Sequence, residues 1–238
     1  MIENRVQNKI VVITGASEGI GFAVAKLFAE NGARVVLASR SPGKLKDASA
    51  KIRAQSTLIT CDVSKPADVA QLKNAVMEAF GTIDILINNA GITRFKPTWE
   101  TSIKDWQAVL NTNLTGTFLV TRVFLQEFMR KKSGHIVNIV SVAGNTAFSN
   151  CSAYCSSKFG QLGFSRVLRQ EMIPYNVRVT AILPGATDTS IWNDFEGTLE
   201  RSRMMRPRDV AEAVWYACNA DKRVTPEEII LRPTSGDV

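Results

Sequence analysis

The sequence predicts an α/β fold in which a seven-stranded parallel sheet carries helices on both faces. Three observations predict it. Short continuous runs of Val, Ile and Leu alternate with longer stretches of helical spacing, which is typical of parallel strands buried on both faces. A glycine-rich turn follows the first run directly. The 238 residues, 45% hydrophobic, suffice for the core of one such domain, and no linker, repeat or low-complexity tract indicates a second.

Seven apolar runs are expected to form the strands, in the order 9–14, 34–39, 56–61, 83–89, 135–141, 176–183 and 228–232. A helical stretch separates each run from the next, and right-handed crossovers would bring the carboxyl ends of the strands together. Ligands bind in the crevice outside those ends. This doubly wound, Rossmann-type arrangement therefore predicts one cleft in a single domain, 1–238.

The turn after the first run contains Gly15, Gly19 and Gly21 and leads into a stretch of helical apolar spacing. Glycines allow the backbone to approach a ligand closely, and a helix N-terminus favours anions, so a strand, this turn and a helix predict a pyrophosphate site. The spacing differs from the common G-x-G-x-x-G pattern. Taken alone, the turn is also compatible with a merely tight connection between strand and helix.

Tyr154 and Lys158 stand four residues apart, and Ser141 stands thirteen residues before the tyrosine. If 153–172 is a helix, as its spacing indicates, the phenol and the ammonium project from one face, about 6 Å apart along the axis. A cation beside a phenol lowers its pKa, so the pair is suited to exchanging protons. The alternative for the pair alone is an ordinary contact on a helix surface.

These residues together resemble the short-chain dehydrogenase/reductase family in its single-domain form, over nearly the whole chain. Its further signatures stand in the expected order: Asp62-Val63, Asn88-Asn89-Ala90-Gly91, Asn113, and Pro184-Gly185 followed by Thr189. The resemblance implies a hydride transfer between a nicotinamide and a carbonyl or secondary alcohol, as in carbonyl and 3-oxoacyl-carrier-protein reductases.

The resemblance assigns catalytic roles to Asn113, Ser141, Tyr154 and Lys158. Tyr154 is the proton donor and acceptor, Ser141 binds the carbonyl oxygen, and Lys158 contacts the nicotinamide ribose. Asn113 holds a water that connects the lysine to solvent, or is a buried amide tied to nearby backbone. The cofactor-binding residues implied are Gly15, Ser17, Glu18, Gly19, Ile20, Gly21, Ser39, Arg40, Asp62, Val63, Asn89, Ala90, Gly91, Tyr154, Lys158, Pro184, Gly185, Thr187 and Thr189.

The end of the second predicted strand indicates NADP(H) over NAD(H). NAD-binding relatives have a carboxylate there for the ribose 2′-hydroxyl, whereas this chain has Arg40, whose guanidinium suits a 2′-phosphate. Glu18 is a departure, because NADP-binding members often have a basic residue at that position. The alternative is that Arg40 is a solvated surface residue.

The substrate pocket is expected to include Arg94, Phe95, Val142 to Asn145, Cys151, and the segment from Ile191 through Met205, within a short lid of about 186–207. These residues are apolar with a few polar points, which suits a carbonyl or alcohol of modest size. The Trp, Phe and Met side chains there are also compatible with core cover. A different class of function, a dinucleotide-binding sensor or scaffold without catalysis, would not need all four catalytic residues.

The net charge of +7 favours anionic partners, among them NADP and an acidic acyl carrier protein. No recognised nucleic-acid motif is present, so no nucleic acid is expected. The four cysteines form no metal pattern and their sparsity fits a reducing compartment, so we expect a cytoplasmic protein without a metal. No apolar run is long enough to span a bilayer, so no membrane association is expected. The helices around 105–131 and 153–172 are the family's usual dimer surface, which implies a homodimer or homotetramer.

Overall fold

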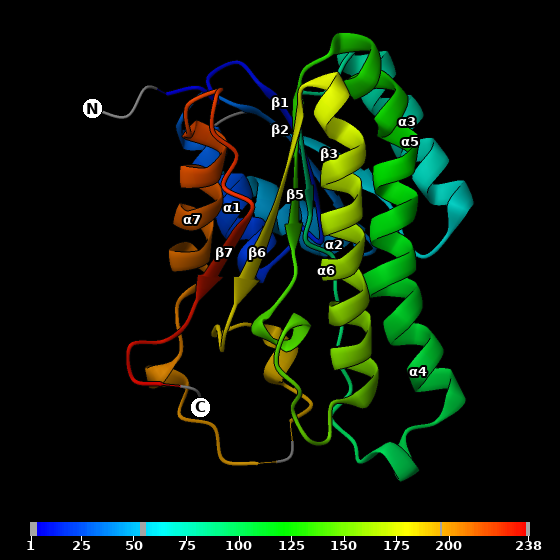
Figure 1. The fold of residues 1–238 in the computed structure, drawn as a ribbon, viewed down its shortest axis with the longest axis vertical. Coiled ribbons are helices and arrows are strands. Elements are labelled where there is room, and N and C mark those ends of the chain that lie inside the picture. The colour runs from blue at the N-terminus through cyan, green and yellow to red at the C-terminus, as the bar shows by residue number, and fades with distance from the viewer. Residues whose placement is uncertain (1–3, 53–55, 196, 237–238) are drawn as a thin grey trace.

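A single seven-stranded sheet, with every pair of neighbouring strands parallel, forms the centre of the protein in a computed structural model that describes residues 4–52, 56–195 and 197–236 (Figure 1). The strand order is β3-β2-β1-β4-β5-β6-β7. The order reverses between β1 and β4, which is the topological switch point of a doubly wound sheet. The Rossmann-type fold predicted from the sequence is confirmed.

The seven predicted strands are all present, each within about two residues of its expected bounds. They are β1 (Ile10–Thr14), β2 (Arg34–Ser39), β3 (Thr57–Thr60), β4 (Ile85–Asn88), β5 (Gly134–Ile139), β6 (Val177–Pro184) and β7 (Glu228–Leu231). The α-helices are α1 (Gly19–Glu30), α2 (Pro42–Ala50), α3 (Pro66–Phe80), α4 (Ile103–Leu110), α5 (Gly116–Lys131), α6 (Ser152–Met172) and α7 (Pro207–Asn219). A π-helical turn, η2 (Asn111–Thr115), joins α4 to α5, and a short 3-10 turn, η3 (Val142–Gly144), follows β5.

Two hydrophobic cores lie on opposite faces of the sheet. One unites alternate residues of β1 and β2 with α1, α2 and α7, and Phe28 meets Trp215 edge to face within it. The other unites the remaining strand residues with α3, α5 and α6 around Phe124 and Phe128. Figure 1 shows α1 and α7 on one side of the strands and α5 and α6 on the other. Because both faces are covered, the five inner strands are continuous, mostly buried apolar runs, whereas the edge strands β3 and β7 are partly exposed.

Local sequence signals place the helix ends. Pro66 and Pro207 stand at the first helical positions of α3 and α7, where a missing N–H costs nothing. Gly81 ends α3 in the left-handed conformation that glycine adopts without strain. Ser102 caps α4 by accepting a hydrogen bond from the Asp105 backbone N–H. These signals determine where the helices of the crossovers begin and end.

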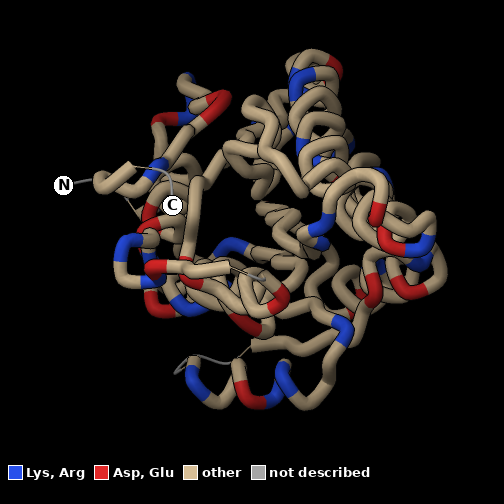
Figure 2. The backbone as a smooth tube through the Cα atoms, turned by 90° about the horizontal axis from the view of Figure 1, so that it is seen from below, with Lys and Arg blue, Asp and Glu red and all other residues tan. Residues whose placement is uncertain are grey.

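All seven strands end at the same edge of the sheet, the lower one in Figure 1. Seen from that edge, Lys, Arg, Asp and Glu are interspersed over the outer helices and loops, without a block of one sign (Figure 2). Within the described ranges, no helix is both long and apolar enough to cross a bilayer. In the same ranges, no three His, Cys, Asp or Glu side chains gather as metal ligands would.

Candidate active site

A cleft of about 660 Å³ opens at the carboxyl ends of the strands and brings the predicted site residues together. Its wall includes Ser141, Tyr154 and Lys158. Every predicted cofactor-binding residue also lines it except Gly21 and Asp62, and Asn113 lies behind the wall. The predicted residues that line the cleft come from seven separate segments of the chain, so their meeting in one cleft follows from the parallel topology.

The glycine turn is held in shape by Asn89. Its Nδ2 donates to the carbonyl oxygens of Thr14 and Gly15, at 3.0 and 3.1 Å. In return, the Thr14 hydroxyl accepts from the backbone N–H groups of Asn89 and Ala90, at 3.0 and 3.1 Å. A side chain on Gly15 would meet the Ala90 backbone, and one on Gly21 would overlap the Asn89 amide. The turn after β1 and the turn after β4 are thus one unit that requires glycine at both places.

The start of α1 suits a pyrophosphate. Gly15 and Gly19 have φ of +63° and +57°, which only glycine adopts readily, and their backbone forms the floor of the cleft. The helix begins at Gly19 with no side-chain cap and no acidic residue in its first turn. Its first N–H groups are therefore available to an anion, and the helix dipole favours one. The residues present fit a dinucleotide.

The outer end of the cleft contains a cluster of polar and charged groups. The Ser17 and Ser39 hydroxyls lie 2.9 Å apart, with the exposed Arg40 beside them. The Glu18 carboxylate pairs at 3.0 Å with the ammonium of Lys44 on α2. Lys44 was not among the residues predicted from the sequence, because its partner is 26 positions away.

Asp62 turns its carboxylate toward its own loop rather than into the cleft. It accepts from the Ser64 backbone N–H at 3.0 Å and from the Ser64 hydroxyl at 2.7 Å. Burial acts to raise the pKa of Asp62, but these bonds and the nearby charges of Arg40 and Lys65 hold it below its ordinary value. Its neighbour Val63 lines the cleft. The predicted contact of Asp62 with the cofactor stays a prediction.

Ser141 and Tyr154 meet at the centre of the cleft. Ser141 ends the segment that leaves β5, and its hydroxyl accepts from the Ala143 backbone N–H at 3.0 Å. The Ser141 side chain also acts to lower the pKa of the Tyr154 phenol. Tyr154 lies in the first turn of α6 and packs with Phe95, Ala143 and the two cysteines that flank it, Cys151 and Cys155. A hydroxyl pair facing one cleft can bind one oxygen atom from two sides.

The expectation that Lys158 lowers the pKa of Tyr154 is not met in the structure. Burial is the largest effect on the phenol and raises its pKa to about 12, although the hydrogen bond with Ser141 acts in the opposite direction. The Lys158 ammonium lies 5.7 Å from the centre of the tyrosine ring. Burial also lowers the pKa of Lys158 to about 7. The phenol is thus held in its protonated form, which is the form that donates.

Lys158 is buried and has two acceptors. Its Nζ donates to the Ile139 carbonyl oxygen at 3.0 Å and to Oε1 of Gln161 at 2.9 Å. Gln161 lies one turn further along α6 and was not predicted. Its spacing of three residues from Lys158 is the signal that could have found it.

Asn113 ties η2 to the segment after β4. Its Oδ1 accepts from the Ile92 N–H at 2.8 Å, and its Nδ2 donates to the Ile92 carbonyl and to the Ser157 hydroxyl, both at 2.9 Å. Of the two alternatives from the sequence, the structure shows the amide tied to nearby backbone. Its predicted contact with a water stays a prediction.

An aromatic wall closes the substrate end of the cleft. Phe95 stacks on Trp192 with ring centres 5.3 Å apart, and Phe195 meets both edge to face. All three line the cleft, as expected. The expectation for Met204 and Met205 is wrong: neither lines the cleft, because Met204 is buried and Met205 packs against the core beside α1 and α7.

Arg94 joins the substrate loop to its surroundings. Its guanidinium lies 3.5 Å from the Asp105 carboxylate on α4 and 3.7 Å from Asp194 in the segment after β6. It also donates to the Thr93 carbonyl at 2.8 Å. One cation therefore bridges the two segments that carry the aromatic wall, although both ion pairs are partly exposed and contribute little stability.

Comparison with known proteins identifies the family to which this chain belongs. Residues 9–199 match the family model described as short chain dehydrogenase. A sepiapterin reductase of Chlorobaculum tepidum is 41% identical over 239 residues, which cover 96% of this chain and 98% of the relative. An uncharacterized oxidoreductase of Staphylococcus aureus is 34% identical, covering 95% of this chain and 97% of the relative.

Solved structures agree in fold. A metagenomic short-chain oxidoreductase in complex with NADP superposes with a TM-score of 0.85 at 30% identity, covering 97% of this chain and 99% of that one. An alcohol dehydrogenase of Thermococcus sibiricus complexed with 5-hydroxy-NADP gives a TM-score of 0.87 at 30% identity, covering 95% and 97% of the two chains. This chain is a member of the short-chain dehydrogenase/reductase family and an oxidoreductase.

Proposed function

We propose that this protein is an NADP(H)-dependent carbonyl reductase in which Tyr154 is the acid. The observation that carries the proposal is the meeting of Ser141, Tyr154 and Lys158 with the glycine turn in one cleft. Two solved relatives hold NADP or 5-hydroxy-NADP, which supports the choice of cofactor.

The cleft residues divide the work of reduction among them. When bound, NADPH supplies the hydride. Ser141 and Tyr154 hydrogen-bond the carbonyl oxygen, where negative charge develops, and Tyr154 donates its proton to that oxygen. Lys158 places positive charge at the base of the site. The Tyr154 phenol keeps its proton at neutral pH, which is the form that the reduction requires.

The proposal is tested by following NADPH absorbance with a panel of ketones, quinones, sugars, 3-oxoacyl thioesters and sepiapterin. We expect turnover with at least one carbonyl, and loss of more than about a thousandfold in the Tyr154→Phe variant with NADPH affinity retained. Binding of NADPH without turnover of any carbonyl would instead favour the sensor. Undiminished turnover in the phenylalanine variant would contradict the role of Tyr154.

The aromatic wall favours a flat ring system next to the reacting carbonyl. Phe95, Trp192 and Phe195 line the cleft, and aromatic side chains stack well on planar groups. The relationship to a sepiapterin reductase supports, as a substrate of this site, a ketone attached to a flat ring system. We expect Trp192→Ala to raise KM for sepiapterin at least about tenfold and to leave KM for a small aliphatic ketone within about twofold. Equal changes for both would contradict a stacking role.

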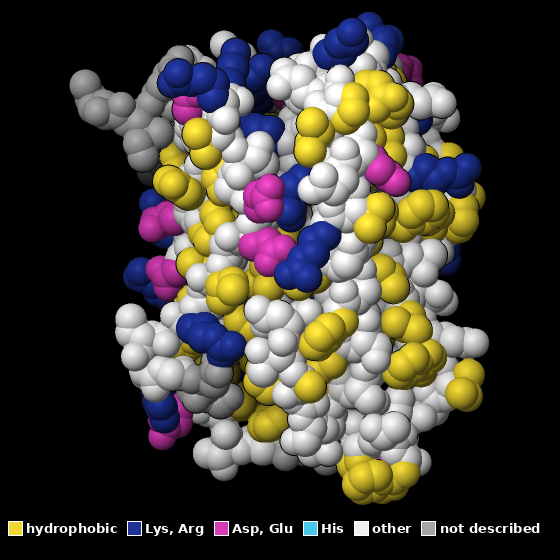
Figure 3. Space-filling view, in the orientation of Figure 1, with side chains coloured by type: hydrophobic (Ala, Val, Ile, Leu, Met, Phe, Trp, Pro, Cys, Tyr) yellow, Lys and Arg dark blue, Asp and Glu magenta, His cyan; other side chains and the backbone are white. Residues whose placement is uncertain are grey.

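We further propose that the protein self-associates through the face formed by α4, α5 and α6. Figure 3 shows hydrophobic side chains distributed over this face. Among them, Ile103, Phe118, Phe159 and Val167 are exposed. An exposed apolar face of this kind is typical of contacts between subunits.

A further inference from the structure

A continuous chain of buried hydrogen bonds leads from Lys158 to the π-helical turn η2. Lys158 Nζ donates to Gln161 Oε1 at 2.9 Å, and Gln161 Nε2 donates to the Thr117 hydroxyl at 2.9 Å. The Thr117 hydroxyl donates in turn to the backbone carbonyl of Asn113 at 2.7 Å. All four residues are buried, and Gln161 is 1% exposed.

The chain leaves the Gln161 amide only one orientation. A carbonyl oxygen accepts and never donates, so the single hydrogen of the Thr117 hydroxyl is directed to Asn113. The Thr117 oxygen must then accept, and only the amide nitrogen of Gln161 can donate to it. The amide oxygen consequently faces Lys158. A flipped amide would present hydrogens to the ammonium and an oxygen to an oxygen, which costs a buried hydrogen bond at each end.

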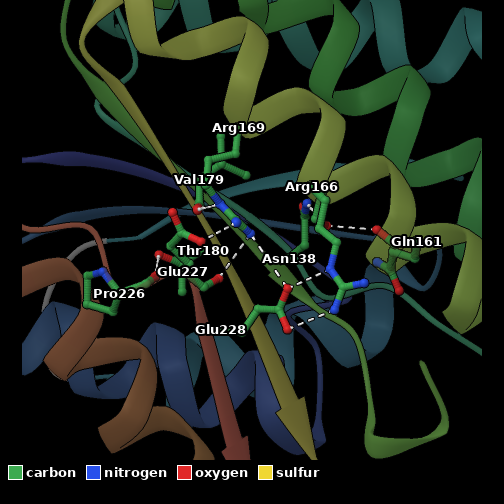
Figure 4. A network of polar contacts seen from close by, with 10 residues as sticks. Asn138, Gln161, Arg166, Arg169, Val179, Thr180, Pro226, Glu227 and Glu228 are labelled. Carbon is green, nitrogen blue, oxygen red and sulfur yellow. Dashed lines mark hydrogen bonds and ion pairs between the residues drawn. The ribbon is translucent and has the colours of Figure 1, made fainter. Parts of the chain in front are cut away.

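The backbone of Gln161 is fixed as well. Its carbonyl oxygen accepts from the Ser165 hydroxyl at 2.7 Å, and Ser165 accepts from Asn138 on β5 at 2.8 Å. Figure 4 shows Gln161 on α6 and Asn138 on the neighbouring strand β5. The amide therefore has little freedom to move away from the lysine.

We propose that Gln161 is a positioning residue, which together with the Ile139 carbonyl holds the Lys158 ammonium at the base of the cleft and leaves its third N–H for the reacting groups. The effect of Gln161 on catalysis rests on the proposed function, whereas its contact with Lys158 does not. Two neutral acceptors stabilise the charged form of the lysine. A carboxylate would form an ion pair with the ammonium and compete for it with the reacting groups.

Among the described residues, no charged side chain faces the Lys158 ammonium. Tyr154 on α6 is the titratable group that faces it. The other polar groups near it are the Ile139 carbonyl from β5 and, across Gly91, the Asn113 amide from η2. The protonation of Lys158 is therefore sensitive to the single acceptor that Gln161 supplies.

The test measures Lys158 directly by NMR of protein labelled with ¹³C at lysine Cε, whose shift follows amine protonation. The Lys158→Met variant assigns the signal. In Gln161→Leu we expect the titration midpoint to fall by about one pH unit, since a hydrogen bond to a charged group is lost. In Gln161→Glu the midpoint should rise by about one unit or more, because an opposite charge is introduced.

Two further variants keep the test decisive. Thr117→Val retains Gln161 but frees its amide to flip, so it should lower the midpoint in the same direction and serves if the leucine variant fails to fold. Thr121→Val is the matched control, because Thr121 lies one turn further on α5 and bonds Asn88 instead. Its midpoint should equal that of the wild type. An unchanged midpoint in both Gln161→Leu and Thr117→Val would overturn the proposal.

Kinetics then separate this inference from the proposed function. If the wild type reduces a carbonyl, kcat in Gln161→Leu should fall at least about tenfold at neutral pH, with Kd for NADPH changed less than about threefold, and Gln161→Glu should recover part of the rate. An inactive wild type with shifted midpoints would refute the reductase and support the positioning role. An active wild type with unshifted midpoints would support the reductase and refute the positioning role of Gln161.

Discussion

The Lys44 ammonium lies 3.0 Å from the Glu18 carboxylate, beside the outer end of the cleft. Glu18 stands where many NADP-binding members of the family have a basic residue, so its charge would repel a 2′-phosphate. The ion pair with Lys44 offsets that charge. We expect Lys44 to compensate from α2 for the basic group that the glycine turn lacks.

Cofactor preference should therefore depend on two cations. Arg40→Ala removes a charge-assisted partner of the phosphate, worth about 1.5–3 kcal/mol, and should lower kcat/KM for NADPH by about 10- to 100-fold. Lys44→Ala leaves Glu18 uncompensated and should also reduce kcat/KM for NADPH, with kcat/KM for NADH nearly unchanged. The measurement is the ratio of the two values for each variant.

Lys46 offers a matched control for this prediction. It is an exposed cation on the same helix, and the Glu18 carboxylate pairs with Lys44 instead. Lys46→Ala should leave the ratio as in the wild type. If Lys44→Ala and Lys46→Ala behave alike, the effect is one of overall charge and not of the Glu18 pair.

The stability of the protein should rise with pH because of Lys158. Its pKa is lowered to about 7 in the folded protein, and it returns to about 10.5 when the chain unfolds. Between these values the unfolded chain binds the extra proton, so raising the pH stabilises the folded state by up to about 1.4 kcal/mol per unit. Urea unfolding of wild type and Lys158→Met from pH 7 to 9 measures this difference. Equal pH dependence in the two proteins would contradict it.

The fold and most of the cleft residues could be predicted because both depend on local sequence. Continuous apolar runs mark the strands, and parallel topology brings whatever follows them to one edge. The pKa of Tyr154 could not be predicted, because it depends on Phe95 and Ala143 packing around the phenol. Lys44 and Gln161 look like ordinary helix residues until tertiary structure places their partners. Met204 and Met205 share the composition of a pocket wall, and only packing shows that they belong to the core.

Self-association should depend on the exposed aromatic residue Phe118 on α5. An aspartate there places a charge in the proposed interface, where it would be buried without a partner. Phe118→Asp should therefore shift the protein toward the monomer, as measured by light scattering after size exclusion. Tyr216→Asp, at an exposed position on α7 across the sheet, is the control and should leave the mass unchanged. A monomeric wild type would refute the proposed interface.

Arg169 should stabilise the C-terminal strand more than its neighbour Arg166 does. Arg169 is buried and donates to the Val179 carbonyl, to the Glu227 carbonyl and, at 2.6 Å, to the Glu227 carboxylate (Figure 4). Replacing it by leucine leaves two backbone carbonyls between α6, β6 and β7 without this donor, which costs about 1–3 kcal/mol. Arg166 forms a bidentate pair with Glu228, at 2.8 and 3.1 Å, but it is exposed, so Arg166→Leu should cost less than about 1 kcal/mol. Urea unfolding of the two variants makes the comparison, because each variant loses one arginine charge and gains the same leucine side chain. A larger loss for Arg166→Leu would show that the surface pair, and not the buried guanidinium, holds β7 against the catalytic helix.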